Sequence, residues 1–316
     1  MNILVTAIGS FSAMSVIETL RRDGNYVVGC DIYPAEWHLE SLRCNAFYQA
    51  PLATNRSVYI EFLLNTCQKE HIDILLPLTD LEIDVINESR EKFISKNIIL
   101  AIPGKDALMI VRNKYLLYDI FSDDKLVPSI PTFRYGVDEI PMDIVPCVAK
   151  PLDGRSSEGL YRCFTDEEYS KTLLNERYII QRMIPGNVIT VDYVRDALSG
   201  ESFCVPREEL LRTKNGAGIS VRIFRDAKLD RLVSHIGEKL GINGCVNMEF
   251  IKNDNGYFLI DVNPRFSAGI AFSLTMGYDM ITSHINCHTG KKIQPKISIR
   301  EQIIVKSYVE TTTQYF

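Results

Sequence analysis

Glu249 and Asp261 are the residues whose type and spacing most directly suggest chemistry. They lie in two stretches of alternating apolar and polar residues, 245–251 and 257–263, joined by turn-forming residues that end in Gly256. This pattern predicts a β-hairpin. With a three-residue loop, 254–256, the residues on one face would pair as Asn253 with Tyr257, Ile251 with Leu259, Glu249 with Asp261 and Asn247 with Asn263.

The opposed carboxylates at Glu249 and Asp261 predict a bound cation. Like charges about 5 Å apart across two strands destabilise a sheet unless a cation lies between them. Together with Asn263 they supply hard oxygen ligands, which suit Mg²⁺. Arg265 follows at the end of the hairpin, and a guanidinium is suited to phosphate. The alternative is a polar, solvated face of an antiparallel sheet.

The residues NMEFI, followed by LIDVNPRFSAG, resemble the metal-binding end of the ATP-grasp ligases, especially small proteins similar to the carbamoyl-phosphate synthetase large subunit. The resemblance implies an ATP-dependent carboxylate-amine ligase that forms an acyl phosphate and releases ADP and phosphate. It also implies ATP and Mg²⁺ (or Mn²⁺) as cofactors, and a small-molecule carboxylate and amine as substrates.

The elements that would position these residues begin with alternating strand and helix patterns up to Gly104. They predict an α/β domain with a parallel, Rossmann-like sheet over residues 1–104. The resemblance places an α+β, two-subdomain ATP-grasp fold after it, with a small subdomain at 105–180 and a large one at 181–316.

A dinucleotide-binding oxidoreductase is a competing interpretation of the first domain. Asp31 ends the second predicted strand, where such enzymes place a ribose-binding acid. The first turn, AIGSFSA, has one glycine where a pyrophosphate loop requires several, which disfavours this interpretation. The turn at 10–12 could hold an anionic group at a helix N-terminus, but a simple helix start is the preferred interpretation.

Two lysines are candidates for contacts with the nucleotide phosphates. The segment 105–124 has a helical pattern, and its Lys114 resembles the opening lysine of the family. Lys150 ends a short strand and precedes a glycine-bounded loop that can close over phosphates. The resemblance identifies this loop as the family's flap, with Ser156, Ser157 and Gly159 as contacts.

The stretch 178–192 resembles the hinge that receives adenine, which implies nucleotide contacts from Gln181, Arg182, Met183, Ile184 and Asp192. Two residues depart from the family pattern. Arg182 stands where a glutamate is expected, and Val188 where a ribose-binding acid is common. These departures leave open a nucleotide-binding or regulatory protein without ligase activity.

Similarity also favours Arg207 as a catalytic contact to substrate or phosphate, alongside Lys150 and Arg265. His284, Cys287 and His288 have helical spacing and could in principle bind zinc, but no fourth ligand accompanies them. A partly buried helix is the preferred interpretation of that segment.

Composition indicates which partners and which cell compartment to expect. The 316 residues carry a net charge of −5, which disfavours a nucleic-acid partner. The eight cysteines form no CxxC pair, as expected in a reducing cytoplasm. No apolar run is long enough for a bilayer, so we expect a cytoplasmic protein with no membrane partner. A homodimer is compatible with the sequence.

Overall fold

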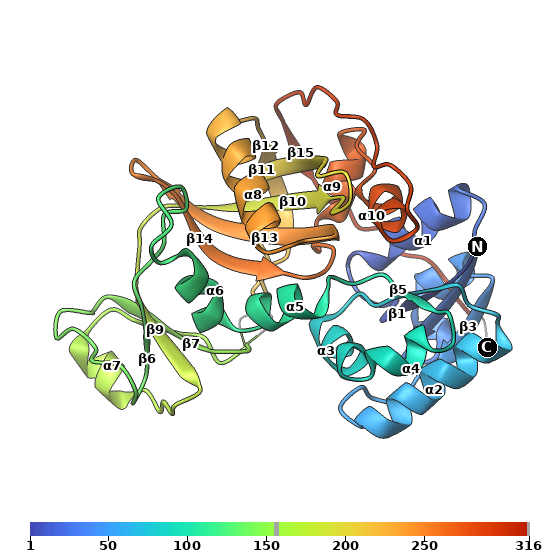
Figure 1. The fold of residues 1–316 in the computed structure, drawn as a ribbon, viewed down its shortest axis with the longest axis horizontal. Helices are drawn as coiled ribbons and strands as arrows, with labels where there is room; N and C mark the ends of the chain where they lie inside the picture. The colour runs from blue at the N-terminus through green and yellow to red at the C-terminus, as the bar shows by residue number, and fades with distance from the viewer. Residues whose placement is uncertain (155–157, 315–316) are drawn as a thin grey trace.

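The computed structural model describes residues 1–154 and 158–314, which form three sheets with their helices (Figure 1). The chain follows the expected order of a parallel α/β domain and two antiparallel subdomains. Ser156 and Ser157 lie outside the described residues. No helix in the described part of the chain is both long and apolar enough to span a membrane.

The N-terminal domain is built on a five-stranded parallel sheet in the order β3-β2-β1-β4-β5. The strands are β1 (Asn2–Thr6), β2 (Tyr26–Asp31), β3 (Ala46–Gln49), β4 (Ile74–Leu76) and β5 (Ile99–Leu100). The helical elements are α1 (Ala13–Arg22), η1 (Ala35–Trp37), η2 (Leu39–Arg43), α2 (Arg56–Lys69), α3 (Asp80–Glu88) and α4 (Arg90–Ile94). The strand order reverses between β1 and β4, which places a crevice beyond their carboxyl ends.

The next part contains a four-stranded antiparallel sheet in the order β6-β9-β7-β8. Its elements are α5 (Lys105–Val111), α6 (Lys114–Phe121), β6 (Thr132–Arg134), β7 (Cys147–Pro151), β8 (Tyr161–Cys163), α7 (Asp166–Lys171) and β9 (Tyr178–Arg182). The helical pattern expected across 105–124 is therefore two helices. The break falls at Asn113, whose side chain accepts hydrogen bonds from the amides of Tyr115 and Leu116 and so caps α6.

The largest sheet is antiparallel, with six strands in the order β14-β13-β10-β11-β12-β15. The strands are β10 (Asn187–Arg195), β11 (Ser202–Arg212), β12 (Gly218–Ile223), β13 (Gly244–Asn253), β14 (Gly256–Asn263) and β15 (Gln302–Val305). The associated helices are α8 (Ala227–Lys239), α9 (Ile270–Thr275) and α10 (Met280–His288). Val191 and Met248 share a buried core with Val233 of α8. On the opposite face, residues such as Val194 pack in a second core with Ile285 of α10, and the rest of that face carries polar groups.

The β13–β14 hairpin differs from the expected one in its turn. Asn253 pairs with Gly256 and Ile251 with Phe258, so the turn has two residues instead of three. An irregularity between Glu249 and the next pair leaves Ile260 as an extra residue in β14. The bulge compensates for the shorter turn, and Glu249 still pairs with Asp261 and Asn247 with Asn263.

Candidate functional site

A cavity of about 830 Å³ lies where the three parts of the chain meet. The N-terminal domain contributes residues 9–12 and 78–81, the four-stranded sheet contributes Lys150 and Gln181, and the six-stranded sheet contributes its polar face. The cavity therefore includes the crevice beyond the carboxyl ends of β1 and β4. The residues of the six-stranded sheet on its wall are Val188, Thr190, Arg207, Glu209, Arg212, Gly218, Asn247, Glu249, Ile251, Ile260, Asp261 and Asn263.

The opposed carboxylates of Glu249 and Asp261 lie on this wall, and each faces a basic side chain. Lys114, the first residue of α6, places its Nζ 2.7 Å from Oδ2 of Asp261. A guanidinium nitrogen of Arg212 lies 3.6 Å from Oε2 of Glu249. The side chains of Glu249 and Asp261 are 23% and 24% exposed, so each keeps one side open to the cavity.

These surroundings shift the pKa values of the two carboxyls in opposite directions. Burial raises the pKa of Glu249; Arg212 opposes this shift, while the negative charge of Asp261 adds to it. Burial also acts to raise the pKa of Asp261, but Lys114 and Lys150 outweigh it and the pKa is lowered. The wall thus contains one ionised carboxylate, Asp261, beside a second, Glu249, whose ionised form a further cation would stabilise.

Lys150 on β7 approaches the same wall from the opposite sheet. Its Nζ donates to the main-chain carbonyl of the bulged residue Ile260 at 3.3 Å. Burial, and then the neighbouring charge of Lys114, lower the pKa of Lys150 to about 8. Two ammonium groups held this close favour an anionic ligand such as phosphate.

The donor set fits Mg²⁺ bound partly by the protein. Asn263 lies beside the carboxylates and donates to Oδ1 of Asn247 at 3.3 Å, so amide and carboxylate groups adjoin on the wall. Among residues 1–154 and 158–314 no group of three or more His, Cys, Asp or Glu could hold a metal ion. Water or phosphate oxygens would therefore complete the coordination, as Mg²⁺ prefers.

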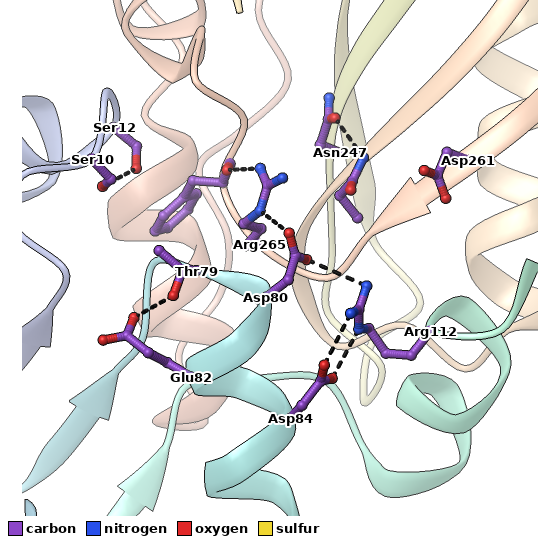
Figure 2. Close-up of polar contacts among 12 residues, drawn as sticks. Ser10, Ser12, Thr79, Asp80, Glu82, Asp84, Arg112, Asn247, Asp261 and Arg265 are labelled. Atoms are coloured by element: carbon purple, nitrogen blue, oxygen red, sulfur yellow. Dashed lines mark hydrogen bonds and ion pairs between the residues drawn. The ribbon is translucent and has the colours of Figure 1, made fainter. Parts of the chain in front are cut away.

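Arg265 links the end of the hairpin to the N-terminal domain (Figure 2). Its Nε donates to Oδ2 of Asp80 at 2.9 Å, and its NH1 donates to the carbonyl of Phe266 at 3.2 Å. Both Arg265 and Asp80 line the cavity. The expected cation is therefore present at the site, but an acid from β4–α3 controls its orientation.

Arg207 and Asp192 form a buried ion pair, which corrects the expected nucleotide contact of Asp192, while the substrate contact of Arg207 stays a prediction. Arg207 is buried, and its three guanidinium nitrogens each donate one hydrogen bond, to Asp192, Glu209 and Ser267 at 2.8, 3.1 and 3.0 Å. Asp192 has no exposed surface and also accepts a hydrogen bond from Ser273 at 2.7 Å. The pair cross-links the sheet to the segment after the hairpin, and Asp192 lies behind the cavity wall.

The hinge residues lie at one end of the cavity. Gln181 is buried and donates to Thr132 Oγ1 at 2.6 Å, whereas Arg182 lies at the surface with its guanidinium 2.9 Å from Asp143. The Met183 amide donates to the carbonyl of Pro146 at 2.8 Å. The Ile184 amide makes no hydrogen bond to any described residue, so it is available to a ligand.

The described part of the flap places Gly159 at the base of the loop. Gly159 has φ +66°, a conformation that favours glycine, and an added Cβ would lie 3.0 Å from both Pro151 Cγ and Tyr178 Oη. Its neighbours Glu158 and Leu160 line the cavity. Gly159 itself therefore shapes the turn, and its predicted contact with a ligand stays a prediction.

Two alternative functions lose support from the geometry. Both ring nitrogens of His284 are engaged, with the Cys245 amide at 2.8 Å and the Ala101 carbonyl at 3.1 Å, and burial lowers its pKa to about 4. The preferred interpretation of a buried helix is confirmed. Asp31 accepts from the amide of Gly9 at 2.9 Å and so stabilises the first turn, where an oxidoreductase would offer this acid to a ribose.

Sequence reasoning missed Asp80, Arg112 and Arg212. Asp80 begins α3 after a three-residue loop that follows β4, so its place near the carboxyl end of a parallel strand could have indicated a site residue. Arg212 lies at the end of β11 and reaches Glu249 through the antiparallel arrangement of the sheet. Arg112 had no comparable local signal, because its role depends on contacts with α3.

Comparison with known families matches two parts of the chain, one in the N-terminal domain and one that spans most of the two antiparallel sheets. Residues 111–269 match the family described as ATP-grasp domain, and residues 3–101 match the PylC-like N-terminal domain. The chain is 26% identical over 183 residues to the carbamoyl phosphate synthase large chain of Clostridium acetobutylicum. That match covers 53% of this chain and only 17% of the relative.

Solved structures share the fold at low sequence identity. Biotin carboxylase of Campylobacter jejuni, in a complex described as β-γ-ATP, superposes with a TM-score of 0.76 at 16% identity, over 95% of this chain and 74% of that one. The biotin carboxylase domain of Hydrogenobacter thermophilus 2-oxoglutarate carboxylase gives 0.73 at 15% identity, over 93% and 70%. The latter was determined as a dimer with MgADP, ADP and bicarbonate.

Proposed function

The chain belongs to the ATP-grasp domain family, and we propose that it is an ATP-dependent ligase that joins a small carboxylic acid to an amine. One observation carries the proposal: the opposed pair Glu249 and Asp261 shares a cavity with the cations of Lys114, Lys150 and Arg265. This combination offers both a metal site and a phosphate site on one wall.

In this proposal the base of ATP lies at the hinge, near Gln181, Met183 and Ile184. The phosphates then extend along the polar face toward Lys114 and Lys150. Glu249 and Asp261 would hold one Mg²⁺, and Asp261 with Asn263 a second. Bound there, Mg²⁺ would neutralise and orient the terminal phosphate oxygens.

The protein groups would act by position and charge. ATP phosphorylates the substrate carboxylate, giving an acyl phosphate and ADP, and the amine then displaces phosphate to form an amide. Lys114, Lys150 and Arg265 would neutralise the charge on the transferred phosphoryl group. The acid and amine would meet in the part of the cavity lined by residues 9–12 and 78–81. Because the acyl phosphate and the amine react directly once they are positioned, no protein nucleophile is required.

A nucleotide-binding protein without ligase activity is the second candidate. Two observations favour it: Arg182 is paired with Asp143 at the hinge, and Val188 is an apolar residue on the cavity wall. Neither provides the acid that usual adenine and ribose contacts require. The ionised Asp261 beside Lys114 supports the catalytic proposal instead.

The test is ADP release under single-turnover conditions with Mg·ATP and an array of acid and amine pairs. The proposal expects ADP and phosphate to appear only when both an acid and an amine are present, and Glu249→Gln to remove the signal. Binding of Mg·ATP without ADP release across a broad array would favour the second candidate.

A further inference from the structure

We infer that Asp80 of the N-terminal domain is a positioning residue for Arg265, so that this domain sets the geometry of the proposed phosphoryl-transfer site. The inference rests on the proposed function. It concerns the first residue of α3, which belongs to another domain and lies far from the β13–β14 hairpin in the sequence.

The contacts of Arg265 leave one nitrogen for a ligand. Nε is held by Asp80 at 2.9 Å and NH1 by the Phe266 carbonyl at 3.2 Å, while NH2 has no hydrogen-bond partner within the described ranges. Figure 2 shows this third nitrogen pointing away from both partners. Two fixed nitrogens determine the plane of the guanidinium and therefore the direction of the third.

Asp80 is itself held between two arginines. Its side chain is 3% exposed, and its Oδ1 lies 3.7 Å from NH1 of Arg112. Arg112 in turn makes two hydrogen bonds to Asp84, at 2.8 and 2.9 Å (Figure 2). The carboxylate thus has the charge of a second guanidinium beside it, but its Oδ1 makes no hydrogen bond to a described residue. Its one side-chain hydrogen bond among those residues is the contact from Oδ2 to Arg265, through which Asp80 can orient that cation.

A plain interdomain link is the competing explanation of this network. Asp80 and Arg265 both line the cavity, whereas Arg112 and Asp84 do not. Of the three ion-paired contacts in this network, Asp80–Arg265 is thus the one whose two partners both border the cavity. A structural link would affect folding alone, but a positioning contact affects the affinity for the terminal phosphate of ATP in particular.

The test compares Mg·ATP with Mg·ADP by calorimetry, because only ATP carries the terminal phosphate. We expect Asp80→Asn, which keeps the shape of the side chain, to weaken Mg·ATP binding about tenfold and to change Mg·ADP binding less than about twofold. Asp84→Asn is the matched control, since it lies on the same helix and shares Arg112 but does not touch Arg265. It should change the ATP-to-ADP affinity ratio less than about twofold.

A double-mutant cycle keeps the test decisive if Asp80→Asn also lowers stability. In an Arg265→Gln background, Asp80→Asn should cause no further loss in the ATP-to-ADP ratio, because it acts through Arg265. An unchanged ratio in Asp80→Asn, or additive losses, would overturn the positioning role while leaving the proposed function intact. Failure of the wild-type protein to bind Mg·ATP would instead overturn the proposed function, and with it this inference.

Discussion

Replacing Asp261 by Asn should separate stability from nucleotide binding. Two unit charges about 5 Å apart in an effective dielectric of 20 repel by about 3 kcal/mol. Removing the Asp261 charge relieves this repulsion of Glu249, but it loses the charged hydrogen bond to Lys114, which contributes about 1.5–3 kcal/mol. The two terms oppose each other, so we expect the free energy of unfolding of the nucleotide-free protein to change by less than about 2 kcal/mol.

No such compensation exists when Mg·ATP is bound, because the carboxylate then attracts the cation. Loss of one metal ligand should weaken Mg·ATP binding at least about 100-fold, more than changes outside the coordination sphere typically do. Urea unfolding and calorimetric titration measure the two quantities separately. Asp254→Asn, at the exposed turn of the same hairpin, is the control and should leave both unchanged.

The reasoning would be refuted by either of two results. Wild-type Mg·ATP affinity in Asp261→Asn would show that this carboxylate does not hold the metal. A loss of stability above about 4 kcal/mol would show that its main contribution is the ion pair with Lys114, at the level expected when a buried charge is left unpaired.

Three further outcomes follow from single contacts. Lys150→Met should weaken Mg·ATP binding at least about tenfold. It should not lower the midpoint of urea unfolding, because it removes a buried ammonium; a lower midpoint with intact binding would contradict the role of Lys150 as a phosphate ligand. Gly237→Ala should destabilise the protein by about 2 kcal/mol or more despite better helix propensity, because the new Cβ would lie 2.3 Å from the Tyr193 ring; a raised melting temperature would exclude this clash. Burial lowers the pKa of His284 from 6.5 to about 4, so the unfolded state gains protons first as pH falls and about 2 kcal/mol is lost between pH 7 and 5. The buried His288, whose pKa is also lowered, adds its own part to the pH dependence; unfolding measured at both pH values should lose the His284 part in His284→Gln and keep the whole dependence in His71→Gln.

The sequence predicted the pairing of the β13–β14 hairpin better than it predicted its turn. The alternation of β13 and β14 placed Glu249 opposite Asp261, and burial of one face preserves that pairing. The turn was shorter by one residue and a bulge at Ile260 restored the register. Neither the shorter turn nor the bulge changes the alternation of the sequence, because together they leave Glu249 opposite Asp261.

Contacts between distant segments were the part that local reasoning could not reach. Lys114 and Lys150 were predicted as separate phosphate ligands, and the structure brings both to the Asp261 wall. Arg207 was predicted as a substrate contact, and the structure adds hydrogen bonds to Asp192 and Ser267 that the sequence did not indicate. The charge and spacing of a residue indicate what it can bind, whereas its actual partners depend on packing between segments.

Titration of the wild-type protein with ATP in a calorimeter, once with Mg²⁺ and once with EDTA, tests the central claim most directly. We predict saturable binding that is at least about tenfold tighter with Mg²⁺, because the metal joins the terminal phosphates to Glu249 and Asp261. Absence of binding, or equal affinity under both conditions, would contradict the assignment of this cavity as a Mg·ATP site.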